Sequence, residues 1–93
     1  MKGPKVTFAR LLHAVAEATG QSTDRLARAG RQRARVKARA LLVYAAREWS
    51  GLTVKDLGRR LHRDPSMIRR LYAGYAGKRT GSLEKRVQAI LKK

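Results

Sequence analysis

Apolar residues recur along almost the whole chain at intervals of three and four positions, which is the period of an amphipathic helix. Phe8, Leu11 and Val15 fall on one face of a first predicted helix. Thr7 precedes this helix as an N-cap, and Gly20 ends it. No segment shows the sustained two-residue alternation of a β-strand. We therefore predict an all-α fold, a compact bundle of about six helices.

The same period places further helices along the chain. A short helix over residues 23–28 presents Leu26, and a long helix over residues 36–50 is ended by Gly51. The positions expected to be buried on the long helix are Ala38, Leu41, Leu42, Ala45 and Trp49. Gly74, Gly77 and Gly81 predict a loose connection before a last helix, which Ser82 caps. The inward positions of that helix are Leu83, Val87, Ile90 and Leu91.

Residues 51–72, GLTVKDLGRRLHRDPSMIRRLY, predict two short helices joined by a tight turn. Thr53 caps the first helix, and an acidic residue three positions later completes a capping box. Asp64 caps the second helix, with Pro65 at the favoured first position. The seam that the two helices share is formed by Leu57, Leu61, Ile68 and Leu71.

Two residues in this segment suit a close crossing of the helices. Gly58 lies where the second helix must pass near the first, and a glycine lets two backbones approach. His62 occupies the turn position that commonly has a positive φ, which histidine tolerates better than most residues. The pattern is that of a helix-turn-helix, whose second helix can enter the major groove of DNA.

Charge narrows the choice of partner. The 93 residues contain 23 Lys and Arg but only 6 Asp and Glu, so the net charge is +17. An excess of this size favours nucleic acid, anionic lipid or an acidic protein as partner. The basic residues are spread through the chain, and several lie inside the predicted helix-turn-helix. Double-stranded DNA is the partner that fits both observations, and no small-molecule substrate is expected.

Composition excludes several other classes. There is no cysteine, so disulfides and thiolate metal sites are absent, and we expect no metal and no cofactor. The longest apolar run, residues 40–46, is far shorter than the roughly 18 residues that a membrane span needs. The start, MKGPKVTF, has no apolar stretch of signal-peptide length, which favours a cytoplasmic, nucleoid-associated protein. We expect one domain over residues 1–93, with a short flexible stretch at residues 1–5.

The exposed face of the second predicted helix carries side chains suited to DNA. Ser66, Met67 and Arg70 are the predicted base readers. Arginine bonds bidentately to guanine, serine bonds to bases or phosphates, and methionine can contact a thymine methyl group. Three further residues are expected to hold phosphates: Arg59, Arg63 and Arg69. Contacts to phosphates position the protein on the DNA without reading its sequence.

The string ARALLVYAAREWSGLTVKDLGRRLHRD resembles the C-terminal DNA-binding domain of the bacterial replication initiator DnaA, whose fold is similar to the Trp repressor. The matching positions are residues 47–49, Thr53, residues 56–58 and residues 63–64, with weaker matches at residues 14–17 and Leu26. The resemblance covers about residues 6–75. It implies binding to double-stranded DNA, replication-origin binding in the initiator, and an ATPase domain as a linked or separate partner.

The resemblance also implies a second DNA contact. In the family a basic loop inserts a cation into the minor groove, and the matching residue here is Lys37, flanked by Arg35 and Arg39. Such insertion suits the narrow groove of A·T-rich DNA. Arg31 and Arg33 belong to the same basic segment, residues 31–39, which is expected to reach the backbone and the minor groove.

The base-reading positions depart from the initiator pattern. The initiator has Asp-His-Thr-Thr where this chain has Asp64, Pro65, Ser66 and Met67, with one residue fewer in the preceding turn. This difference argues against recognition of the usual initiator box. The DnaA-like domains of tyrosine transposases associated with repetitive extragenic palindromes resemble the chain as well, in VAEATG and LEKRVQAILKK. A catalytic domain is then the implied partner.

Other functions remain as alternatives. A small helix-turn-helix transcriptional regulator and an RNA-binding basic protein share the charge, although RNA binders of ribosomal type more often expose stacking aromatic residues. A cationic membrane-surface peptide would need one wide apolar face, whereas apolar positions occur on several helices here. His13 and His62 are isolated, and Tyr44, Tyr72 and Tyr75 have the spacing of packing residues. We therefore expect no enzymatic activity.

Overall fold

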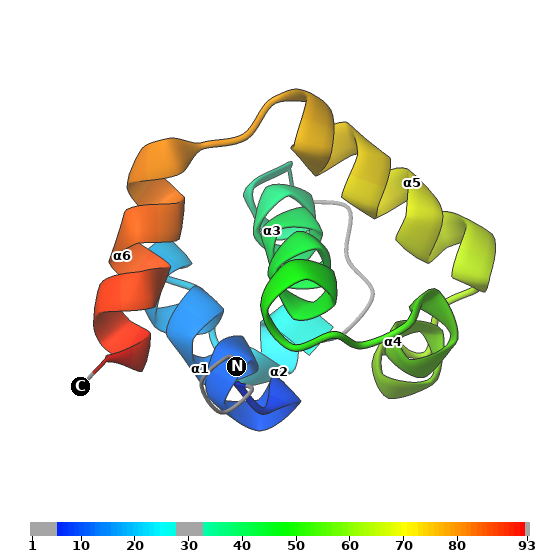
Figure 1. The fold of residues 1–93 in the computed structure, drawn as a ribbon, viewed down its shortest axis with the longest axis horizontal. Coiled ribbons are helices and arrows are strands. Elements are labelled where there is room, and N and C mark those ends of the chain that lie inside the picture. The colour runs from blue at the N-terminus through cyan, green and yellow to red at the C-terminus, as the bar shows by residue number, and fades with distance from the viewer. Residues whose placement is uncertain (1–5, 28–32, 93) are drawn as a thin grey trace.

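The structure, a computed structural model, describes residues 6–27 and 33–92, and the regular elements of these residues are all α-helices (Figure 1). In chain order they are α1 (Phe8–Thr19), α2 (Thr23–Ala27), α3 (Arg33–Trp49), α4 (Val54–Leu61), α5 (Pro65–Gly77) and α6 (Gly81–Leu91). The all-α prediction is confirmed. The flexible stretch expected at residues 1–5 lies outside the described residues.

Helix α3 runs through the middle of the molecule (Figure 1). Helices α1, α2 and α5 pack against it, and α6 packs against α1. Every residue from Leu41 to Ala46 is buried, which is the pattern of a helix covered on all sides. The uninterrupted apolar run of residues 40–46 therefore encodes a core helix.

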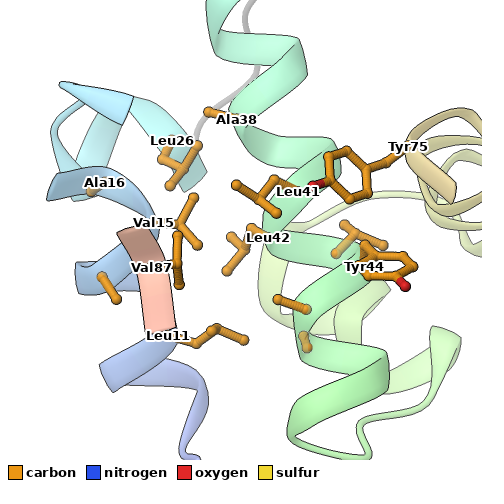
Figure 2. Close-up of a cluster of buried hydrophobic side chains, with 14 of the residues drawn as sticks. Leu11, Val15, Ala16, Leu26, Ala38, Leu41, Leu42, Tyr44, Tyr75 and Val87 are labelled. Atoms are coloured by element: carbon orange, nitrogen blue, oxygen red, sulfur yellow. The ribbon is translucent and has the colours of Figure 1, made fainter. Parts of the chain in front are cut away.

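The core is one cluster of buried side chains that lies on both sides of α3 (Figure 2). On one side, Leu11, Val15 and Val87 come from α1 and α6. On the other side, α4 and α5 contribute the fully buried side chains of Leu57, Leu61 and Ile68. Complete burial of a Leu, Ile or Val side chain contributes about 1.5–3 kcal/mol. Helices α1, α2, α4 and α5 thus pack directly on α3, and α6 is held through α1.

Several predicted helix ends are confirmed. The Thr7 hydroxyl accepts from the Arg10 amide at 3.2 Å, and Gly20 ends α1 with φ 73°. Both bonds of the predicted capping box are present at α4. The Asp56 amide donates to the Thr53 hydroxyl at 3.1 Å, and the Thr53 amide donates to the Asp56 carboxylate at 3.3 Å.

Other helix boundaries were predicted wrongly. Helix α3 begins at Arg33, not at residue 36, because arginine and alanine favour helix even where an apolar face is missing. Helix α5 continues through Gly74 to Gly77, because burial of Tyr75 offsets the helix penalty of about 1 kcal/mol for each glycine. Helix α6 begins at Gly81, so Ser82 lies in its first turn and does not cap it.

Among residues 6–27 and 33–92, no helix is both long and apolar enough to cross a membrane. Even the central α3 begins with basic residues and carries Arg47 and Glu48 in its last turn.

Candidate nucleic-acid interface

A sharp turn joins α4 to α5. His62 has φ 56° and ψ 48°, the left-handed conformation expected at this position. Its amide and that of Arg63 both donate to the Gly58 carbonyl, the latter at 2.8 Å. Asp64 then returns to an extended conformation, and Pro65 begins α5. The backbone of the turn is thus fixed against the last turn of α4.

Gly58 makes this turn possible. A Cβ atom at Gly58 would lie 2.8 Å from the Arg63 carbonyl oxygen, which is closer than real Cβ contacts. The predicted close approach is confirmed, although the nearest group is the turn backbone and not the body of the second helix. Any side chain at this position would push the turn, and with it the start of α5, away from α4.

The buried face of α5 rests on both α3 and α4. Ile68 is completely buried, and Tyr75 is 5% exposed. The Tyr44 ring of α3 stacks on the Tyr72 ring at a centroid distance of 5.3 Å and contacts the Tyr75 ring at 5.0 Å. The Tyr72 hydroxyl donates to the Glu48 carboxylate, and this bond raises the pKa of Tyr72. These tyrosines are packing residues, as the sequence predicts.

The opposite face of α5 is open to solvent. Ser66, Met67 and Arg70, the predicted base readers, are all exposed, and Met67 has 40% of its surface accessible. Arg69 is exposed on the same helix. A helix fixed along one side and carrying two arginines along the other can enter a groove without changing its own packing.

Asp64 does not form the predicted cap. Its carboxylate accepts from the Ser66 hydroxyl at 2.6 Å, and its side chain makes no bond to the amides of the first turn. The Asp64 carbonyl accepts from the Met67 and Ile68 amides at 2.9 and 3.2 Å. A hydroxyl has one proton to donate, so Ser66 keeps only its acceptor capacity for a ligand.

The predicted phosphate contacts on α4 and the turn differ in their availability. Arg59 is exposed, and so is Arg69 on α5. Arg63 is half-buried, and its Nη1 donates to the Leu61 and His62 carbonyls at 3.2 and 3.3 Å. Part of the Arg63 guanidinium therefore stabilises the turn, which leaves its other nitrogens to face a phosphate.

Only part of the predicted basic loop can be placed. Arg31 lies outside the described residues, as do the side chains of Arg33 and Arg35, whose backbones form the first turn of α3. Lys37 is exposed one turn further along. Because the segment from Arg33 onward is helical, Lys37 projects from a helix and not from a loop.

The structure corrects the role of Arg39. Its side chain is 3% exposed, and its Nε donates to the Leu26 carbonyl at 3.0 Å. An arginine buried in this way ties α3 to the end of α2 and has no surface to offer to DNA. The reason is its place on α3, three residues before Leu42, which turns it toward the core.

Lys37 and Arg70 meet at one surface hollow between α3 and α5. We call this the α3–α5 hollow; it is lined by Val36, Lys37, Ala40, Arg70, Leu71, Gly74, Tyr75 and Lys78. Lys37 belongs to the predicted basic segment and Arg70 to the predicted reading face, 33 positions further along the chain. Both thus border the α3–α5 hollow. The sequence indicated each half but not that both border the same hollow.

The acidic residues leave the cations of α5 uncompensated. Hydrogen bonds from the side chain and backbone of Thr53 hold the pKa of Asp56 below 3.8. Glu48 accepts from Tyr72, and Glu84 pairs with Arg79 at 2.7 Å. No acidic side chain in the described part of the chain forms an ion pair with Arg69 or Arg70.

A buried polar cluster near the start of α6 was missed by the sequence reasoning. Glu84 is 6% exposed and accepts from the Tyr75 hydroxyl at 2.7 Å and from two nitrogens of Arg79, at 3.0 and 2.7 Å. The Arg79 hydrogen bond holds the pKa of Glu84 below 4.5, with Tyr75 adding to the effect. The sequence gives no sign of this cluster apart from the spacing of five positions between Arg79 and Glu84.

No group of three His, Asp or Glu side chains that could hold a metal occurs within residues 6–27 and 33–92. Comparison with known proteins adds no assignment: the sequence matches no protein-family model and no curated protein.

Proposed function

We propose that this chain is a DnaA-like module that binds double-stranded DNA in a sequence-specific manner. The observation that carries the proposal is the exposed face of α5, whose Arg69 and Arg70 have no ion-pair partner among the described residues. A net charge of +17 supplies the long-range attraction to phosphates.

In this proposal α4 and α5 form a helix-turn-helix within a six-helix, Trp-repressor-like fold. The α5 helix enters the major groove, where Arg70 reads guanine and Met67 contacts a thymine methyl group. Ser66 accepts from the exocyclic amino group of adenine or cytosine, because its own proton is held by Asp64. Arg59, Arg63 and Arg69 hold phosphates.

The second contact lies at the start of α3. Lys37 reaches the sugar–phosphate backbone of the DNA or the adjacent minor groove, since it borders the same hollow as Arg70. Arg31, Arg33 and Arg35 extend this contact, as the family resemblance implies. Arg39 has no part in it, because its side chain is buried.

The role of a binding module in a replication initiator, or in a transposase whose catalytic part is a separate domain, follows from the resemblance alone. A small transcriptional regulator would use the same face. We infer no enzymatic activity for the chain itself, and we propose that it is associated with the nucleoid.

Selection of bound sequences from a random duplex pool tests the proposal. We expect enrichment of one motif, and an affinity for the selected duplex that falls by about three to five powers of ten between 50 and 200 mM salt. Enrichment of the initiator box, of palindromic repeats or of another motif would identify the biological context. No enrichment would contradict sequence-specific binding, and preferential binding to single-stranded RNA would favour the RNA-binding alternative.

A further inference from the structure

Gly74 is one of the residues that line the α3–α5 hollow. This residue lies inside α5, where glycine costs about 0.5–1 kcal/mol relative to alanine. A Cβ atom at Gly74 would meet nothing within 4 Å, so the packing of the protein does not require a glycine there. The missing side chain exposes the backbone of α5 at the hollow, as expected where a ligand approaches closely.

Part of the lining of the hollow is apolar. Val36 is 36% exposed, one of the few large apolar side chains left open in the described residues. Ala40 and Leu71 are half-buried beside it. Together with the bare backbone at Gly74, these groups form a small surface that is not covered by the protein itself.

Three cations accompany this apolar surface. Lys37, Arg70 and Lys78 line the hollow and are exposed, and no acidic side chain of the described residues lines it. None of the three forms an ion pair with a described acidic residue. The hollow thus presents apolar carbon and positive charge side by side.

A nucleic-acid strand has matching chemistry. Each backbone unit carries one negative phosphate and one sugar ring whose C–H groups are apolar, and clefts that follow the backbone bring cations to the phosphates. An acidic peptide could match the charge as well. Arg70, however, belongs both to the hollow and to the proposed reading face, so a DNA strand can run from one to the other without a break.

We propose that the α3–α5 hollow seats one sugar–phosphate unit of the DNA backbone. The deoxyribose lies over Ala40 and the backbone of Gly74, the phosphate lies between Lys37 and Lys78, and Arg70 leads from this site into the proposed reading face. The inference rests on the proposed DNA binding and adds to it a defined backbone site, in which Lys78 and Gly74 take part.

The first test fills the hollow. Gly74→Leu places a side chain where the sugar is proposed to lie, and leucine favours helix more than glycine does, so α5 is retained. We expect the affinity for a short duplex of mixed sequence to fall by at least about tenfold, because the lost backbone contacts are sequence-independent. Gly77→Leu is the matched control: it makes the same change on the same helix, where a Cβ atom also meets nothing within 4 Å. It does not line the hollow and should bind as the parent does.

The second test removes one charge. Lys78→Gln should lower the slope of log affinity against log salt by about 0.9, the value for one phosphate contact. Lys92→Gln makes the same change in net charge at the far end of α6 (Figure 1) and should leave the slope unchanged. Thermal unfolding of all four variants serves as the control that each retains the fold.

The outcomes separate the two proposals. If the parent does not bind duplex DNA, the proposed function itself fails. If the parent binds with a steep salt dependence but Gly74→Leu and Lys78→Gln behave like their controls, the function stands and the backbone site is overturned. Loss of affinity in both variants, with both controls unchanged, supports the site.

Discussion

Two arginines of this chain, Arg39 and Arg70, contribute equally to its net charge but have opposite surroundings in the structure. Arg39 is buried and bonds the Leu26 carbonyl, whereas Arg70 is exposed on α5. The difference follows from the period of each helix. Position 39 shares a face with the buried Leu42, and position 70 lies opposite the buried Ile68 and Tyr75 side of α5. A cation predicts a nucleic-acid contact only when its place on the helix also leaves it exposed.

This distinction leads to a test of base reading against phosphate binding. Arg70→Ala should cost about 1–3 kcal/mol for the selected duplex and relax its preference at one base pair. Arg69→Ala should weaken binding to all duplexes alike and lower the salt slope. Binding measured on the selected duplex and on single-base variants of it provides the comparison. Equal loss of affinity on every duplex for Arg70→Ala would remove its reading role.

Glu84 provides a residue-scale test of stability. Glu84→Gln leaves Arg79 and the Tyr75 hydroxyl without a charged acceptor, so the free energy of unfolding should fall by about 1–3 kcal/mol. Because the pKa of Glu84 is lowered in the folded state, the charge contributes stability above its usual value of 4.5. That contribution is lost as the pH falls through the lower folded value.

Thermal unfolding of the parent and of Glu84→Gln across acidic pH tests this account. The gap between the two should be full above about pH 4.5 and should close as the pH is lowered further. A gap that stays constant through the acidic range would show that Glu84 acts through packing alone.

At the scale of the helices, the junction of α4 and α5 determines how the proposed reading face is presented. Its capping box, the positive φ of His62 and the bare Gly58 each concern only a few consecutive residues. All of these features were predictable from the sequence, because caps and tight turns depend on local chemistry. The direction of α5 then follows from the turn.

Substitution of Gly58 and of Gly74 by alanine should change the stability of the protein in opposite directions. Gly58→Ala brings a Cβ atom to 2.8 Å from the Arg63 carbonyl, so the gain in helix propensity is outweighed and stability should fall by about 1–2 kcal/mol. Gly74→Ala meets open space and should gain about 0.5–1 kcal/mol. Chemical denaturation of both variants measures the two changes. A stabilised Gly58→Ala would contradict the close approach at the turn.

The sequence did not predict what depends on contacts between distant residues. Helix α5 passes through Gly74 because the tyrosine side chains of α3 and α5 pack together, which no local rule contains. The expected Asp64 cap is a local exception: its carboxylate accepts from Ser66, only two residues away, and the sequence pattern does not decide between these nearby donors. That Lys37 and Arg70 border one hollow depends on the packing of α3 against α5.

At the scale of the molecule, one apolar core around α3 holds the helices that carry the proposed DNA contacts. Four of the 6 acidic residues, Glu48, Asp56, Asp64 and Glu84, accept hydrogen bonds within the protein, and the 23 Lys and Arg outnumber all six, so most of the positive charge is uncompensated. Because the contacts on α3 and α5 are fixed on one scaffold, they can engage a duplex together. We therefore propose that α5 and Lys37 form one continuous DNA-binding surface.

The most direct test is the change in backbone amide chemical shifts when duplex DNA is added to the isotope-labelled chain. We expect the largest changes at Ser66, Met67 and Arg70, further changes at Lys37, and small changes on α1. If residues 66–73 did not shift while the protein bound the duplex, α5 would not be the reading helix. Changes confined to α1 or α6 would place the interface elsewhere and contradict the account.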